Sequence, residues 1–116
     1  RQRQMCKETE TEAMKLRWKK RIVFEKGYTE MCAEWMAERL EALTDHLQYG
    51  HAAAIAYQKQ NGDFKLVKAT LIYYEAEFHK KYDPTQIEGA VVYWNVDEQR
   101  WTTFQMENFM EWRPIV

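Results

Sequence analysis

Residues that could carry out acid–base, nucleophilic or metal chemistry are few in this sequence, and they do not cluster. The three histidines are His46, His51 and His79, and no His-x-x-x-His or Cys-x-x-Cys spacing brings two metal ligands together. The chain contains no serine, so it cannot build a Ser-His-Asp triad. Its four glycines are dispersed and cannot form a phosphate-cradling loop. The sequence therefore predicts a protein that is not an enzyme, holds no metal and needs no cofactor.

Two cysteines and two neighbouring carboxylates are the remaining candidates for chemistry. Cys32 falls on an apolar helical stripe, where we expect it to be buried and unreactive, whereas Cys6 lies near the start of the sequence. Glu75 and Glu77 are expected to be solvated charges rather than an acid–base pair. Two cysteines do not make a disulfide scaffold, and no signal-peptide pattern opens the sequence, so we expect a cytoplasmic protein with reduced thiols.

A run of basic residues surrounds Trp18. Its members are Lys15, Arg17, Lys19, Lys20 and Arg21. On a helix, these side chains would fan over more than half of the circumference and could follow a phosphate backbone. However, the whole chain carries 17 basic and 18 acidic residues, for a formal charge of −1. We therefore favour a solvated helix face and keep nucleic-acid binding by this run as the alternative function.

Aromatic residues make up 15% of the chain, and a group of them surrounds the segment between residues 73 and 101. The group consists of Tyr73, Tyr74, Phe78, Tyr82, Trp94 and Trp101. Tyrosine and tryptophan are frequent anchors of protein interfaces. Because only one side-chain parity of a strand faces inward, some of these residues must face outward. We expect at least two or three to remain partly exposed and to form a surface that binds a protein partner.

The elements that must position these residues differ between the two halves of the chain. Residues 1–49 are rich in helix-forming residues, and we expect helices over about 9–25 and 29–48. A Thr-x-x-Glu capping box at residues 9–12 predicts a start near residue 10, and Gly27 predicts the end. Met14, Trp18 and Ile22 recur at intervals of four and mark the packing face of the first helix.

The second helix has a longer apolar stripe. Thr29 is the expected N-cap. The stripe consists of Cys32, Met36, Leu40, Leu43 and Leu47, and Met31, Trp35 and Ala42 are expected to widen it. We expect this stripe to pack on the other helix or on the strands that follow, and the helical arm leaves a homo-oligomer open.

From residue 50 onward the apolar period changes to two, which predicts strands. Asn61-Gly62 predicts a hairpin with a type I′ turn between the first two strands. A long loop with a helical turn over 74–81 precedes a second hairpin, and a short turn over 107–109 leads into a fifth strand. We therefore expect an α+β protein in which an N-terminal helical pair (1–49) packs on a five-stranded antiparallel SH3-like β-barrel (50–116), together forming one compact unit.

Several strand motifs support this barrel. They are Ala56-Tyr57-Gln58-Lys59-Gln60-Asn61-Gly62, Lys68-Ala69-Thr70-Leu71, Val92-Tyr93-Trp94-Asn95-Val96, Arg100-Trp101-Thr102-Thr103-Phe104 and Glu107-Asn108-Phe109. Through them, residues 54–112 resemble an SH3-like β-barrel family of unknown function found in gut bacteria, their phages and their mobile elements. Ala69 stands where that family commonly has glycine, and residues 1–49 have no counterpart. The resemblance implies a mobile-element or gut-bacterial context and no catalytic residues.

Composition, motifs and resemblance together predict a non-enzymatic accessory protein. We expect it to be encoded by a phage or mobile element and to dock on a host or virion protein, as an inhibitor or as a structural component. No apolar run is long enough to span a membrane, so no membrane partner is expected.

Overall fold

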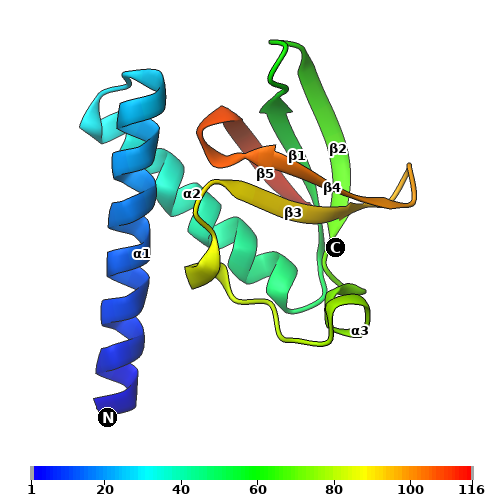
Figure 1. Cartoon of the computed structure of the whole chain (residues 1–116), viewed down its shortest axis with the longest axis horizontal. Helices are drawn as coiled ribbons and strands as arrows, with labels where there is room; N and C mark the ends of the chain where they lie inside the picture. The colour runs from blue at the N-terminus through cyan, green and yellow to red at the C-terminus, as the bar shows by residue number, and fades with distance from the viewer. Residues whose placement is uncertain (1, 116) are drawn as a thin grey trace.

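The structure, a computed structural model, describes residues 2–115 of the chain and their side chains from Glu10 onward. Two long helices precede a five-stranded antiparallel sheet, as Figure 1 shows. The elements are α1 (Gln2–Lys26), α2 (Glu30–Gln48), β1 (Ala52–Gln58), β2 (Phe64–Thr70), α3 (Tyr74–Phe78), η1 (Pro84–Gln86), β3 (Ala90–Asn95), β4 (Arg100–Gln105), η2 (Met106–Asn108) and β5 (Phe109–Ile115). This arrangement confirms the predicted α+β class.

The sheet has the strand order β4-β3-β2-β1-β5. β1 pairs along its length with both β2 and β5, whereas β2 pairs with β3 only at Ala69 and Thr70. The sheet therefore splits into two halves that share the end of β2, and it curls into an SH3-like barrel that does not close. This split decides where the surface of the barrel is left open.

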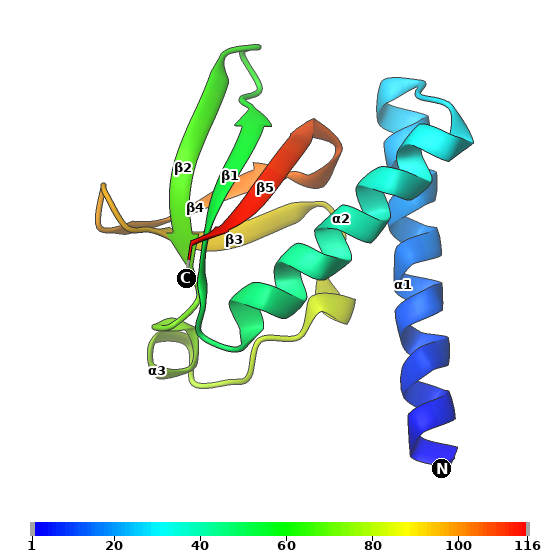
Figure 2. The same cartoon turned by 180° about the vertical axis from the view of Figure 1, so that it is seen from behind.

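The helices cover one side of the barrel. In Figure 2, α2 crosses diagonally between α1 and the strands, and it contacts β1 and β5. The predicted face of α1 is confirmed, because Met14, Trp18 and Ile22 are all buried. The indole Nε1–H of Trp18 donates to the carbonyl oxygen of Ile87 at 3.2 Å, which ties α1 to the loop before β3.

The predicted start of the first helix is wrong. α1 begins at Gln2 and runs straight through the proposed capping box at residues 9–12. Residues 2–8 are mostly good helix formers, so nothing in the sequence stops the helix there. Its end is as predicted, because Gly27 adopts a positive φ of 69° and its N–H bonds to the carbonyl of Val23.

The predicted stripe of α2 is confirmed at Met36, Leu40, Leu43 and Leu47, but not in its first turn. Thr29 caps the helix as expected, with its side chain accepting from the N–H of Cys32. Cys32 itself is exposed, as are Met31 and Trp35, so these three positions were predicted wrongly. The residues that the helix buries are Ala33, Met36, Ala37, Leu40, Leu43, Thr44 and Leu47. Small alanines let α2 approach its neighbours closely, and a pattern of large apolar residues alone does not reveal this.

The hairpin at Asn61-Gly62 is confirmed, but its turn type is not. The β1–β2 connection is longer than two residues, and the N–H of Lys59 bonds to the carbonyl of Asp63 at 2.7 Å. Gly62 has a positive φ of 93°, whereas Asn61 does not have a positive φ. A type I′ turn requires both, so the assignment of that type was wrong.

Reciprocal contacts between Arg39 and Trp112 join α2 to β5. The Arg39 guanidinium donates to the carbonyl oxygen of Trp112 at 2.8 Å and lies 4.9 Å from the centre of its ring. In return, the indole Nε1–H of Trp112 donates to the carbonyl oxygen of Arg39 at 2.9 Å. Arg39 also donates to the carboxylate of Glu111 at 2.9 Å, so one side chain fixes the helix to an edge strand.

The Glu111 carboxylate makes stability depend on pH in the acid range. Burial opposes its ionisation, but the N–H of Trp112, Arg39 of α2 and Arg113 of its own strand together lower the pKa of Glu111. A lowered pKa means that the folded state binds this proton more weakly than the unfolded state does. The stabilisation is therefore present above the unfolded pKa and is lost as the pH falls. We expect the unfolding free energy of wild type to fall more steeply than that of Glu111→Gln between about pH 5 and pH 3. Urea titrations at several pH values measure this, and parallel curves would contradict it.

Candidate functional site

The sheet and one short helix bring the six predicted aromatic residues together. Trp94 of β3 lies directly opposite Trp101 of β4 in the strand register. Val91, Tyr93 and Asn95 point into the core, so Trp94 must point outward. α3 then lies beside this pair of tryptophans and supplies Tyr74 and Phe78. We call these residues, namely Tyr73, Tyr74, Phe78, Tyr82, Trp94 and Trp101, the aromatic surface.

The rings of the aromatic surface form one continuous series of contacts. Ring centres are 5.3 Å apart between Tyr73 and Trp94, and also between Trp94 and Trp101. Trp101 continues the series to Phe78 at 5.1 Å. Tyr74 lies 6.0 Å from Trp101 and 4.8 Å from Phe78. Most of these pairs meet edge to face, which is a favourable aromatic geometry and holds the rings in fixed positions.

Exposure differs across the aromatic surface. Tyr73 is 52% exposed and Phe78 is 41% exposed, while Tyr74, Trp94 and Trp101 are partly buried. Tyr82 is buried at the end of the series, 5.2 Å from Tyr74, and burial raises the pKa of its hydroxyl. Tyr82 therefore supports the aromatic surface from below, and the other five rings are at least partly exposed.

Most of the cations in the basic run of α1 make separate intramolecular contacts. Lys15 pairs with Glu38 of α2 at 3.2 Å, and Lys19 pairs with Glu30 at 3.4 Å. Arg17 donates to the carbonyl oxygen of Thr85 at 2.8 Å. Arg21 pairs with Glu107 at 2.9 Å, while Lys20 is exposed. These partners lie on α2, on η1 and on η2, so the structure does not gather the five cations into one free face.

Arg21 has a structural environment that a solvated cation would lack. Its guanidinium bonds to the buried carboxylate of Glu107 and to the side-chain oxygen of Gln105 at 3.2 Å. The hydrogen bond with Glu107 raises the pKa of Arg21. A Cβ added at Gly89 would lie 2.7 Å from the guanidinium carbon, so the absence of a side chain at Gly89 makes room for this pair. Arg21 therefore attaches α1 to η2.

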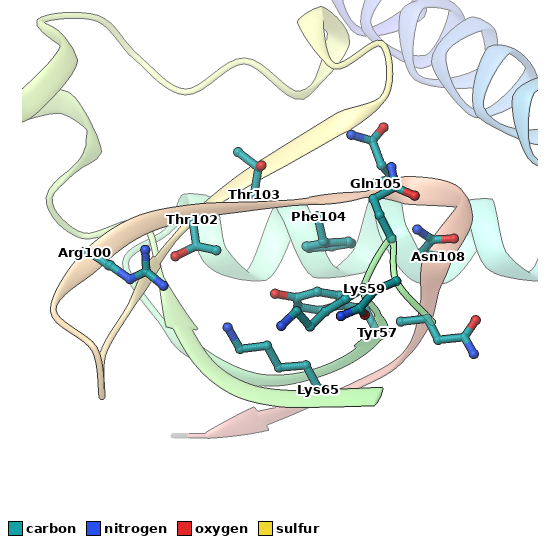
Figure 3. Close-up of a pocket in the computed structure, with 12 residues that line it drawn as sticks. Tyr57, Lys59, Lys65, Arg100, Thr102, Thr103, Phe104, Gln105 and Asn108 are labelled. Atoms are coloured by element: carbon teal, nitrogen blue, oxygen red, sulfur yellow. The ribbon is translucent and has the colours of Figure 1, made fainter. Parts of the chain in front are cut away.

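A groove opens where β4 separates from the β1–β2 hairpin (Figure 3). Its volume is about 450 Å³. The lining residues are Tyr57, Gln58, Lys59, Gln60, Asn61, Lys65, Arg100, Thr102, Thr103, Phe104, Gln105 and Asn108. Three of them are cations and none is an acid. The stacked rings of Tyr57 and Phe104, with centres 4.8 Å apart, lie at its base.

The cations of this groove were not predicted from the sequence, although the strand position of one of them indicates that it faces inward. Val67 and Ala69 face the core, so Lys65 has the parity of an inward-facing residue on β2. A lysine at an inward position indicates an opening in the barrel wall. Lys59 and Arg100 carry no such signal, because both lie next to turns. Glu98 pairs with Lys65 at 3.6 Å and with Arg100 at 2.8 Å.

Neither a metal site nor a membrane helix is found in the described part of the chain. Among the side chains from Glu10 to Ile115, no group of three or more potential ligands could hold a metal ion. Within the same range, no helix combines the length and apolar character that crossing a membrane requires. Glu75 and Glu77 are both exposed on α3, and the Cys6 thiol lies outside the described side chains.

Comparison with known proteins identifies the barrel. A family model described as WYL_2, with an Sm-like SH3 β-barrel fold, matches residues 40–110. No curated protein and no solved structure matches the chain significantly. The match runs from the second half of α2 into β5, and it confirms the SH3-like barrel that the resemblance implied.

Proposed function

The chain belongs to the WYL_2 family, whose fold is an Sm-like SH3 β-barrel, and we propose that it is a non-enzymatic accessory module that binds a protein. The partner docks on the aromatic surface. In this proposal the barrel and α3 serve as a rigid scaffold, and the chemistry of the module is recognition rather than catalysis.

The observation that carries the proposal is the continuity of the aromatic surface. Tyr73 and Phe78 project at its exposed rim, and the half-buried Trp94 and Trp101 lie between them in direct ring contact. Ordered aromatic side chains lose little entropy when a partner binds, so a fixed series of rings supports tight docking. A continuous exposed aromatic patch of this kind is typical of a surface that binds a partner.

The biological setting follows from the resemblance and the cysteine content. We propose that the module is encoded by a phage or mobile element of a gut bacterium, acts in the cytoplasm, and docks on a host or virion protein. An inhibitor of a host complex and a structural component of a virion both use such a surface. Cys32 is a free exposed thiol, which suits a reducing compartment.

Nucleic-acid binding through the basic run is the alternative function, and the contacts of that run weigh against it. Arg21 and Lys15 have intramolecular carboxylate partners, and Arg17 is bonded to a backbone carbonyl. To contact phosphates, α1 would have to break contacts that hold it to α2, η1 and η2. Lys20 alone would add little to a phosphate-binding surface.

We also propose that the helical arm binds a second copy of the chain. The two helices and the turn between them expose Leu16, Phe24, Tyr28, Met31 and Trp35. A second copy covering these side chains would bury apolar area away from the aromatic surface, so the two modes of binding are compatible.

Site-specific crosslinking tests the proposed docking surface. We would replace Tyr73 with the photo-crosslinking residue p-benzoylphenylalanine and irradiate the protein in lysate of the native host cell. Tyr49, an exposed tyrosine at the end of α2, is the matched control position. We expect position 73 to capture one protein reproducibly, and position 49 to capture it at least about tenfold less, because only the first lies on the aromatic surface. Equal capture at both positions, or capture at neither, would contradict the proposal.

A further inference from the structure

The N-terminal half of β2 has a free edge beside the cationic groove. β1 pairs with all of Phe64–Thr70, but β3 pairs only with Ala69 and Thr70. The carbonyl oxygen of Lys68 accepts from the N–H of Val96 at 2.9 Å, on the side of β2 that faces β3. For residues 64–67, no described strand occupies that side.

The backbone groups at this edge are set by the alternation of an antiparallel strand. Leu66 and Phe64 share the parity of Lys68, so their N–H and C=O groups point to the same side as its carbonyl. The N–H of Lys59 bonds to the carbonyl of Asp63, so the backbone groups of Asp63 face the β1 side. Those of the next residue, Phe64, therefore face the opposite side, which is the free edge. Two N–H groups and two carbonyl oxygens are thus presented in strand geometry, which is a template for an added strand.

The side chains on the two faces of β2 differ in chemistry. Phe64 and Leu66 are exposed on the outer face. On the inner face, Lys65 lines the groove together with Thr102 and Phe104 of β4, and its side chain extends toward the side where Arg100 lies, as Figure 3 shows. A strand added beside β2 would therefore place alternate side chains against an apolar face and a cationic face.

Two further features of the groove fit a polar, acidic occupant. Thr102 Oγ1 is buried and has no hydrogen-bond partner, and the Thr102 side chain lines the groove. Lys59 and Arg100 lie at the margins of the groove on either side of Lys65. Glu98 already neutralises part of this charge, and its pKa is lowered by the hydrogen bond with Arg100. Even so, Glu98 pairs with only two of the three cations, Lys65 and Arg100.

We propose that β2 binds an extended peptide segment of a partner protein by strand addition, and that this segment alternates acidic and apolar residues. The backbone of the segment pairs with Phe64 and Leu66, its acidic side chains meet Lys59, Lys65 and Arg100, and its apolar side chains cover the outer face. None of the six residues of the aromatic surface lines the groove. This proposal therefore goes beyond the docking function and can fail or hold separately from it.

A synthetic peptide tests the proposal directly. The probe is a fluorescein-labelled heptapeptide of alternating valine and glutamate, titrated against the full chain by fluorescence anisotropy. We expect a Kd below about 1 mM, with the N–H groups of Phe64 and Leu66 exchanging more slowly with solvent in the complex. A fully N-methylated version of the peptide cannot pair with a strand edge and should not bind. A valine–lysine version should not bind either, because the groove is cationic.

Protein variants locate the site on β2. Leu66→Pro removes one N–H at the free edge without touching the β1 ladder, and we expect at least a tenfold weaker affinity. Leu66→Ala keeps that N–H and should weaken binding less than Leu66→Pro does. Lys65→Ala should weaken binding about fivefold through loss of charge. The N-methylated peptide keeps the test decisive if Leu66→Pro does not fold.

Three results would overturn the proposal. The first is equal affinity for the N-methylated and the unmodified peptide. The second is equal affinity for the valine–lysine and the valine–glutamate peptides. The third is binding of oligothymidine, with loss of that binding in Lys65→Ala, while the valine–glutamate peptide does not bind; the groove would then be a nucleic-acid site instead.

Discussion

Replacing Trp18 with alanine is expected to lower the free energy of unfolding by about 4 kcal/mol. Trp18 is 2% exposed, and its indole packs in the core while its Nε1–H bonds to Ile87. Truncation removes the buried ring, leaves a cavity and orphans the carbonyl of Ile87. Urea denaturation followed by circular dichroism measures the change.

Trp35 provides the matched control for that experiment. It lies on α2 and is 49% exposed, so Trp35→Ala should cost less than about 1 kcal/mol. If Trp18→Ala does not fold, Trp18→Phe keeps an aromatic ring and should give an intermediate loss. Equal losses for Trp18→Ala and Trp35→Ala would show that α1 is not an integral part of the fold.

Arg21→Ala is expected to lower the free energy of unfolding by about 2 kcal/mol. The substitution leaves the carboxylate of Glu107 buried without its cation, and breaking a buried pair in this way is strongly destabilising. One third of the Arg21 side chain is exposed, so water can partly replace it, and the expected loss is smaller than for a fully buried pair.

Lys20→Ala is the control for Arg21→Ala. Lys20 is the neighbouring cation of the same basic run and is exposed, so its loss should change stability by less than about 0.5 kcal/mol. Adding Glu107→Gln to Arg21→Ala removes the buried charge and should recover part of the stability. Identical stabilities for the two single variants would mean that Arg21 is a surface cation, as the sequence suggests, and not an attachment of α1 to η2.

The elements of this fold could be predicted from local patterns, because each pattern depends on nearby residues. The spacing of Met14, Trp18 and Ile22 identified the packing face of α1, since residues four apart share one face of a helix and all three are buried. The stripe of α2 was predicted less well, because α2 packs against α1 on one side and β1 and β5 on the other. Ala33 faces these neighbours and is buried, whereas Cys32, one position away, faces outward and is exposed.

The two candidate sites also differ in how far they could be predicted from the sequence. The residues of the aromatic surface could be predicted as a group, because most of them come from one continuous segment and its adjoining hairpin. The groove could not, because its two walls, Lys65 of β2 and Thr102 of β4, are brought together by the topology of the sheet. The intramolecular partners of the basic run could not be predicted for the same reason. The partner of Arg21 is Glu107, near the other end of the chain.

The most direct test of the aromatic surface is an affinity measurement on the partner captured from position 73. Isothermal titration of that partner would compare wild type with the double variant Tyr73→Ala, Phe78→Ala and with Tyr49→Ala as control. Both substituted residues of the double variant lie at the exposed rim, so the fold should persist. Docking on the aromatic surface predicts an affinity at least about thirtyfold weaker for the double variant, or about 2 kcal/mol, and no change for Tyr49→Ala. An unchanged affinity of the double variant, with its unfolding free energy close to that of wild type, would contradict the proposed function.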